Sequence, residues 1–141
     1  LNLRIPWWVN GEAVVSVNGT EEGRYAAGTG FASLRREWKD GDTIRILMPQ
    51  NIHTWSLPED NNTVAFLSGP VLLAGLCGEE RRLEVPAGTD PAALLVHDGE
   101  REWGAWRDTF KVTGQAQGFR FLPMYQIGYD AYTTYFPLKY V

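Results

Sequence analysis

Residues capable of acid–base chemistry are numerous in this 141-residue chain, but they form no recognisable catalytic motif. Hydrolysis of a glycosidic bond needs two carboxyl groups that flank the bond. The chain has 17 Asp and Glu residues, so such a pair cannot be chosen from spacing alone. The pairs Glu79-Glu80 and Glu100-Glu102 lie in polar, loop-like segments, where carboxylates are usually solvated. We expect no catalytic residue in the chain.

The remaining candidates for nucleophilic or metal chemistry are two histidines and one cysteine. His53 and His97 are far apart in the sequence, and neither has an acidic or Cys-rich motif beside it. Cys77 ends the apolar run 71–77, which predicts a small buried hydrophobic thiol. A single cysteine can form neither an internal disulfide nor a Cys-rich metal site. We therefore expect no metal and no cofactor, and the sequence does not specify a cellular compartment.

Charge and hydropathy exclude two classes of partner. The formal net charge is -4, and no Lys/Arg cluster is longer than two residues, so a basic face for nucleic acid is not expected. No segment approaches the roughly 18 consecutive apolar residues of a membrane span. The chain begins at Leu1 without Met and alternates at once like a strand, so we interpret it as a segment excised from a larger protein.

Aromatic residues are the most suggestive feature, with 6 Trp, 6 Tyr and 6 Phe. Trp and Tyr rings stack on the apolar faces of sugars, and their polar edges bind hydroxyl groups. The candidate binding residues near predicted strand ends or loops are Trp7, Trp8, Trp55, Trp103 and Trp106. They are expected either to form a sugar platform or to fill the core and contact a neighbouring domain. Adjacent residues of an extended strand point to opposite faces, so one of Trp7 and Trp8 should enter the core.

The elements that would position these residues are mainly strands. Alternating or β-branched runs predict strands over 1–5, 13–17, 31–38, 43–48, 63–67, 71–76, 110–112, 119–122 and 132–136. Asn18-Gly19 predicts a type I′ hairpin because both residues tolerate positive φ. Pro70 has no N–H, so Gly69-Pro70 predicts a bulge or bend that lets the chain serve two parts of a sandwich.

The segment 78–105 differs from the rest because it is polar and rich in turn residues. Asp90 followed by Pro91 predicts the start of one short helix there. The fold class is thus predicted as all-β, an antiparallel, jelly-roll-like β-sandwich with a loop-rich insert around 78–105. One domain over 1–141 is expected, with the insert extending at most over 78–118.

Several segments together resemble the C-terminal β-sandwich region of glycoside hydrolase family 127, the β-L-arabinofuranosidase-like proteins. The segments that carry the resemblance are 3–8, 15–19, 36–44, 64–75, 121–127 and 132–136. Their order and spacing are more specific than any one of them, and 78–118 is the least similar part. In this bacterial carbohydrate-metabolism family, the catalytic glutamate and the cysteine-rich zinc site lie in a helical toroid that would precede Leu1, and no position of this chain matches them.

The resemblance implies a non-catalytic accessory domain whose partner is the preceding catalytic domain of the same polypeptide. A carbohydrate-binding module that uses exposed aromatic residues is the alternative, so carbohydrate is the second partner considered. Self-association through an apolar patch near Trp7 or Trp8 is the third. A self-contained enzyme and an adhesion or assembly module are weaker alternatives.

Overall fold

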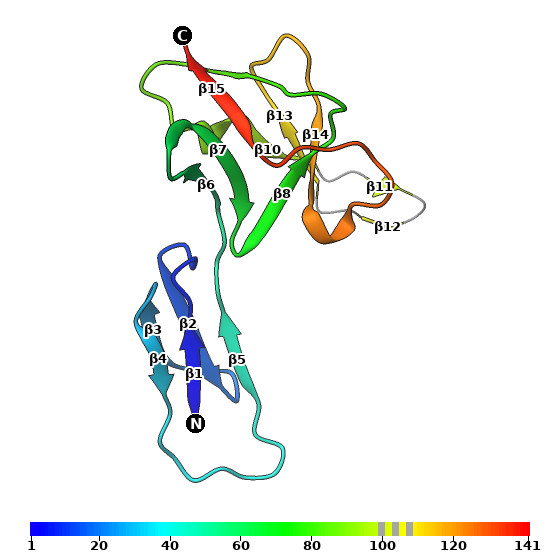
Figure 1. Ribbon diagram of the computed structural model, residues 1–141. Helices are drawn as coiled ribbons and strands as arrows, with labels where there is room; N and C mark the ends of the chain where they lie inside the picture. Colours follow the sequence, from blue (N-terminus) through cyan, green and yellow to red (C-terminus); the bar gives the residue numbers. More distant parts are fainter. Residues whose placement is uncertain (99–100, 103–104, 107–108) are drawn as a thin grey trace. The chain divides into compact units, whose positions relative to one another are not determined.

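A computed structural model describes residues 1–98, 101–102, 105–106 and 109–141, and it is almost entirely β. Two short 3-10 helices occur, and this described part of the chain contains no α-helix. The chain divides into two compact units, Leu1–Asn51 and Ile52–Val141 (Figure 1). The predicted all-β, antiparallel-rich fold class is confirmed. A single β-sandwich domain over 1–141 stays a prediction.

The first unit consists of two small antiparallel sheets. In one sheet, β1 (Asn2–Ile5) pairs with β4 (Gly30–Ser33). In the other, β2 (Glu12–Val17) is the central strand between β3 (Thr20–Ala26) and β5 (Ile44–Leu47). Only β2 and β3 are consecutive in the chain, because β1 reaches past β2 and β3 to pair with β4, and β2 pairs with β5 beyond β3 and β4.

One apolar cluster holds the first unit together. Alternation along β2 sends Ala13, Val15 and Val17 to the interior, where each is almost fully buried. They pack in one core cluster with Ile5 of β1 and Ala32 of β4. Residues of both sheets thus share one interior, which is the arrangement that defines a sandwich.

Turn chemistry fixes the register of β2 and β3. Asn18 and Gly19 have φ of 51° and 81°, the two positive values that a type I′ hairpin requires. Val17 pairs with Thr20 across this turn. The predicted hairpin is confirmed.

The second unit contains one branched sheet of eight strands. The order is β10 (Leu95–His97), β13 (Phe110–Val112), β14 (Arg120–Pro123), β8 (Val71–Gly75), β7 (Asp60–Ser68), β15 (Phe136–Tyr140), β9 (Leu83–Val85), with β6 (Ile52–Leu57) also on β7. A separate hairpin joins β11 (Arg101–Glu102) to β12 (Ala105–Trp106). Among the described strands of this unit, every pairing is antiparallel except that of β9 with β15.

Strand β7 is the branch point of this sheet. Strand β6 pairs along Val64–Ser68 on one edge, so the other edge is shared by β8, near Ser68, and β15, near Thr63. The two branches enclose a core that contains Phe66, Phe121 and Phe136, each fully buried. Their ring centroids are 5.0 to 5.9 Å apart in edge-to-face and tilted contacts, a geometry worth roughly 0.5–1.5 kcal/mol per pair beyond burial.

Several predicted elements differ in extent from the observed ones. The strand expected over 31–38 ends at Ser33, and the one expected over 132–136 lies at Phe136–Tyr140. The segment 78–105, predicted to be loop-rich, supplies β9 and β10 to the sheet. The predicted short helix is observed as the 3-10 helix η1 (Pro91–Leu94), where Ala92 N donates to the Asp90 carboxylate at 2.9 Å.

Gly69 and Pro70 do form a bend, but it does not link two parts of the sandwich. Ser68 pairs directly with Val71, so β7 and β8 are adjacent strands of one hairpin. Gly69 has φ of 52°, and proline fixes a negative φ at the next position, which is the φ pattern of a type II′ turn. The expectation that this bend carries the chain between two parts of the sandwich is therefore wrong.

Candidate functional site

The Trp7-Trp8 pair has one exposed and one half-buried member. Both residues lie in a turn after β1 rather than in a strand. Trp7 is 54% exposed, whereas Trp8 packs against the core of the first unit. Gly28 N donates to Pro6 O at 3.1 Å, which attaches the start of this turn to the loop after β3. The expectation that one indole enters the core is confirmed, although a turn, not strand alternation, separates the two rings.

The other predicted tryptophans do not join this pair in the same unit. Trp55 lies in the second unit on β6, where its side chain is 60% exposed. Trp103 lies outside the described residues, and Trp106 lies in β12 with a side chain that is not described. Among the described side chains, Trp7 and Trp8 thus lie in one unit and Trp55 in the other, and the role of the five tryptophans in binding stays a prediction.

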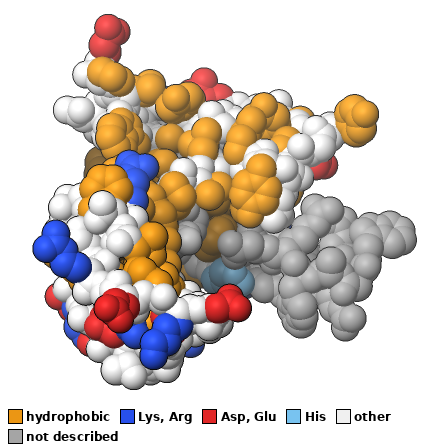
Figure 2. All heavy atoms as spheres, turned by 90° about the horizontal axis from the view of Figure 1, so that it is seen from below, with side chains coloured by type: hydrophobic (Ala, Val, Ile, Leu, Met, Phe, Trp, Pro, Cys, Tyr) orange, Lys and Arg blue, Asp and Glu red, His pale blue; other side chains and the backbone are white. Residues whose placement is uncertain are grey.

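The first unit exposes more large apolar side chains than the sequence suggested. Apolar side chains are widespread on the face drawn in Figure 2. In the first unit the exposed large apolar residues are Leu1, Trp7, Phe31, Trp38, Ile44 and Leu47. Phe31 lies directly opposite Arg4 in the β1–β4 ladder, on the face away from the core. Exposed apolar side chains that gather in one patch are typical of a contact surface for another protein part.

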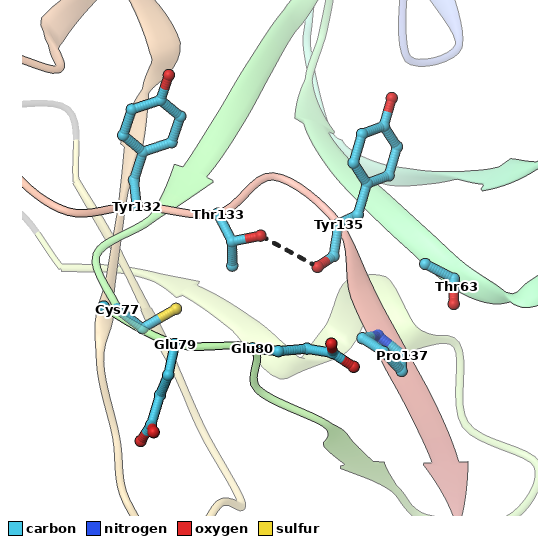
Figure 3. A pocket seen from close by; sticks show the side chains of 9 residues that line it. Thr63, Cys77, Glu79, Glu80, Tyr132, Thr133, Tyr135 and Pro137 are labelled. Carbon is cyan, nitrogen blue, oxygen red and sulfur yellow. Dashed lines mark hydrogen bonds between the residues drawn. The ribbon is translucent and has the colours of Figure 1, made fainter.

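The second unit contains an open pocket of about 510 Å3 (Figure 3). Its lining residues come from three separate segments: Thr63, Cys77, Glu79, Glu80, Tyr132, Thr133, Tyr135 and Pro137, with Gly78. In Figure 3 the rings of Tyr132 and Tyr135 project to the same side of the segment that joins them. Glu79 and Glu80 lie on the other border of the pocket.

An isolated β-bridge holds the tyrosine segment in place. Gly75 N donates to Thr133 O at 2.8 Å, and Thr133 N donates to Gly75 O at 3.0 Å. Phe136, which follows Tyr135, is fully buried and starts β15. Tyr132 and Tyr135 thus lie on backbone that is fixed at Thr133 and at Phe136.

The polar groups of the pocket do not resemble a metal site or an activated nucleophile. Burial raises the pKa of the Cys77 thiol, which opposes thiolate formation, while the charge of Arg81 lowers it to a smaller extent. Glu79 forms an ion pair with Arg81 at 3.2 Å. Among the described residues, no group of three or more His, Cys, Asp or Glu side chains is placed to hold a metal ion.

The two histidines are placed apart from this pocket, on separate strands. His53 lies on β6, and His97 lies on β10 with its ring 5.4 Å from that of Phe110 in an edge-to-face contact. Within the described part of the chain, no helix has both the length and the apolarity needed to span a membrane.

Sequence reasoning missed the tyrosines of the pocket. Tyr132 and Tyr135 were included in a predicted strand, where one ring would be expected to be buried. The structure places both before β15 and leaves each close to half exposed. The density of tyrosines between 125 and 135 was the available signal.

The comparisons with known proteins agree with the resemblance seen in the sequence. Residues 1–50 match the family described as the middle domain of GH127 β-L-arabinofuranosidase. A search of curated proteins gives no match. This match covers about a third of the chain, and it confirms the resemblance to GH127 proteins that the sequence suggested.

Solved structures extend the similarity of fold to almost the whole chain. A glycoside hydrolase matches with a TM-score of 0.70 at 20% identity, over 98% of this chain and 27% of its own. A GH127 β-L-arabinofuranosidase from Geobacillus stearothermophilus T6 gives 0.68 at 19% identity, over 99% and 26%. A further GH127 β-arabinofuranosidase gives 0.69 at 17% identity, over 98% and 27%. The chain thus spans about a quarter of the length of these proteins.

Proposed function

We propose that this chain is a non-catalytic β-sandwich portion of a GH127-type glycoside hydrolase and that it packs against and supports a linked catalytic domain. The observation that carries the proposal is the extent of the match. Nearly all of this chain corresponds to about a quarter of each GH127 structure, which leaves most of each of those proteins for other functions.

The surface of the first unit supports a docking role. Trp7 and Phe31 are more than half exposed, and they lie within the segment that matches the GH127 middle domain. Covering one such aromatic side chain removes enough area from water to stabilise a contact by roughly 1.5–3 kcal/mol. A linked domain is the partner that this surface fits, because the related proteins are several times longer than the chain.

Activity measurements on the isolated chain test the absence of catalysis. We expect no turnover of aryl β-L-arabinofuranosides or other aryl pentosides. Turnover that is lost on a single carboxylate substitution, such as Glu80→Gln in the pocket, would show that the chain is an enzyme. Turnover unchanged by every Asp or Glu substitution would instead point to a contaminating hydrolase.

Hydrogen exchange tests the docking role directly. In a polypeptide that joins this chain to its GH127 catalytic domain, amides near Trp7 and Phe31 should exchange more slowly than in the isolated chain. Amides near Trp55 serve as an internal comparison from the other unit. Equal exchange near Trp7 and Phe31 in the two proteins would contradict docking through the first unit.

A further inference from the structure

The open pocket of the second unit combines the groups that recognise sugars. Tyr132 and Tyr135 are 44% and 49% exposed, so ring surface is available at its border. Glu79 and Glu80 supply carboxylate acceptors, and Thr63 supplies a hydroxyl group. A volume of about 510 Å3 lies within the roughly 300–1,000 Å3 usual for small-molecule sites.

The backbone that carries these groups is fixed before any ligand binds. The Gly75–Thr133 bridge and the burial of Phe136 hold the tyrosine segment on both sides of Tyr135. Cys77 lies on the border that carries Glu79 and Glu80, and its N donates to Gly75 O at 2.9 Å. Gly75 therefore binds both the tyrosine segment, through Thr133, and the segment that starts at Cys77. When the backbone of a site is already ordered, less conformational entropy is lost on ligand binding, which favours affinity.

The charge of the pocket selects among ligand classes. The described residues that line the pocket include no Lys or Arg, which disfavours a ligand with a phosphate, sulfate or uronate group. Glu79 is paired with Arg81, whereas Glu80 forms no ion pair with any described residue. Two carboxylates without further ligands are too few for a bound divalent cation. A neutral, hydroxyl-rich ligand satisfies both the carboxylates and the aromatic rings.

We propose that this pocket binds a neutral oligosaccharide, with Tyr132 and Tyr135 contacting sugar rings and Glu80 accepting hydrogen bonds from hydroxyl groups. This binding site goes beyond the accessory role and does not depend on it, because all of its residues lie in the second unit. The binding residues also differ from the tryptophans that the sequence suggested.

Titration calorimetry of the isolated chain tests the site with three probes: arabinotriose, xylotriose and the anionic trimer of galacturonic acid. We expect at least one neutral trimer to bind, and the galacturonate trimer to bind at least about tenfold more weakly than that trimer, because Glu80 repels its charge. Absence of binding by both neutral trimers, or tighter binding of the anionic one, would overturn the proposal.

Substitutions localise the binding to the pocket. Tyr132→Ala and Tyr135→Ala should each weaken binding about fivefold or more, and Glu80→Gln about tenfold, because a charged acceptor becomes a neutral one. Tyr129→Ala is the matched control, since Tyr129 is fully exposed and does not line the pocket. Binding that survives the three pocket substitutions, or that falls equally with Tyr129→Ala, would overturn the assignment. A melting temperature like that of the unmodified chain shows that each variant is folded.

Discussion

Asn18 connects the β2–β3 turn to the loop before β5 through its side chain. Its Nδ2 donates to the Asp42 carboxylate at 2.8 Å, and its Oδ1 accepts from Thr43 N at 2.8 Å. Asp42 also accepts a hydrogen bond from Lys39 N at 3.0 Å. Asn18 adopts the positive φ that the tight turn requires, and its side-chain amide also holds the loop before β5. The Asn-Gly pattern predicts the turn but not these side-chain hydrogen bonds.

These hydrogen bonds make the first unit sensitive to acid. The bond from Lys39 N, and then that from Asn18, hold the pKa of Asp42 below its ordinary value. A lowered carboxyl pKa contributes stability that is complete above the ordinary value, roughly pH 4, and is lost as the pH falls through the lowered one. We therefore expect the difference in unfolding free energy between the unmodified chain and Asp42→Asn to shrink as the pH falls from 6 toward 2. Urea titrations at several pH values measure it.

Asp40→Asn is the control for this experiment, because Asp40 is a neighbouring exposed carboxylate that takes no part in these hydrogen bonds. Its unfolding free energy should follow that of the unmodified chain across the same pH range. A constant difference between Asp42→Asn and the unmodified chain at all pH values would show that Asp42 contributes nothing through its charge.

Cys77 should behave as a structural thiol. It is 8% exposed, its Sγ lies 3.7 Å from Gly75 O, and burial raises its pKa. Because the thiolate is the reactive form, a disulfide reagent at pH 8 should modify native Cys77 at least about tenfold more slowly than the urea-unfolded chain. Absorbance of the released thiol gives both rates, and equal rates would contradict the burial of this group.

At the scale of elements, β8 and β15 meet at Gly75 in a contact that allows no side chain. A Cβ built on Gly75 would lie 2.6 Å from the Phe136 ring and 2.8 Å from that of Phe119. Both rings belong to the packed aromatic core, so neither can move away at low cost. Gly75→Ala should lower the free energy of unfolding by about 1–3 kcal/mol, the usual effect of overpacking, in urea titrations.

Gly78→Ala is the matched control for Gly75→Ala. Gly78 is exposed, and a Cβ there would come no closer than 3.8 Å to its nearest neighbour, Ala131. Its stability should therefore change little. A similar loss in both variants would show that backbone conformation, rather than contact with the aromatic rings, accounts for the glycine at position 75.

Elements set by local turn chemistry were predictable from the sequence, and elements set by distant partners were not. The hairpin at Asn18-Gly19 and the helix start at Asp90 depend on a few adjacent residues, and both occur as predicted. The last strand was predicted over 132–136, earlier than β15, because aromatic and β-branched residues are dense there. In the structure, β15 pairs with β7 up to Pro137 and with β9 from Leu138 onward, so the proline lies where the strand changes partner.

The same distinction applies to the candidate site. The pocket joins three segments, around Thr63, Cys77 and Tyr132, which meet only because β15 pairs with β7 and Thr133 bridges to Gly75. No local pattern encodes that meeting, so sequence analysis found the aromatic content but not these residues. The opposite environments of Trp7 and Trp8, by contrast, were anticipated from their adjacency.

At the scale of the whole molecule, each unit closes its own core, and the remaining apolar surface is available for partners. The first unit encloses Val15 and Val17, and the second encloses its phenylalanine cluster. Trp7 is more than half exposed and is not part of either core cluster. Trp7 is therefore a residue at which docking and self-association can be tested with only a small effect on folding.

Trp7→Ser should reduce self-association of the isolated chain, measured by sedimentation velocity, and should shift its melting temperature by only a few degrees. The reason is that Trp7 is 54% exposed and contributes little to the core. Trp8→Ser is the matched control, because it removes an indole that packs on the core and should lower the melting temperature more. In a polypeptide with its catalytic domain, Trp7→Ser should speed amide exchange around the turn. If oligosaccharides instead quench the Trp fluorescence of the isolated chain, and Trp7→Ser abolishes that quenching, Trp7 is a sugar platform and the interface assignment is wrong.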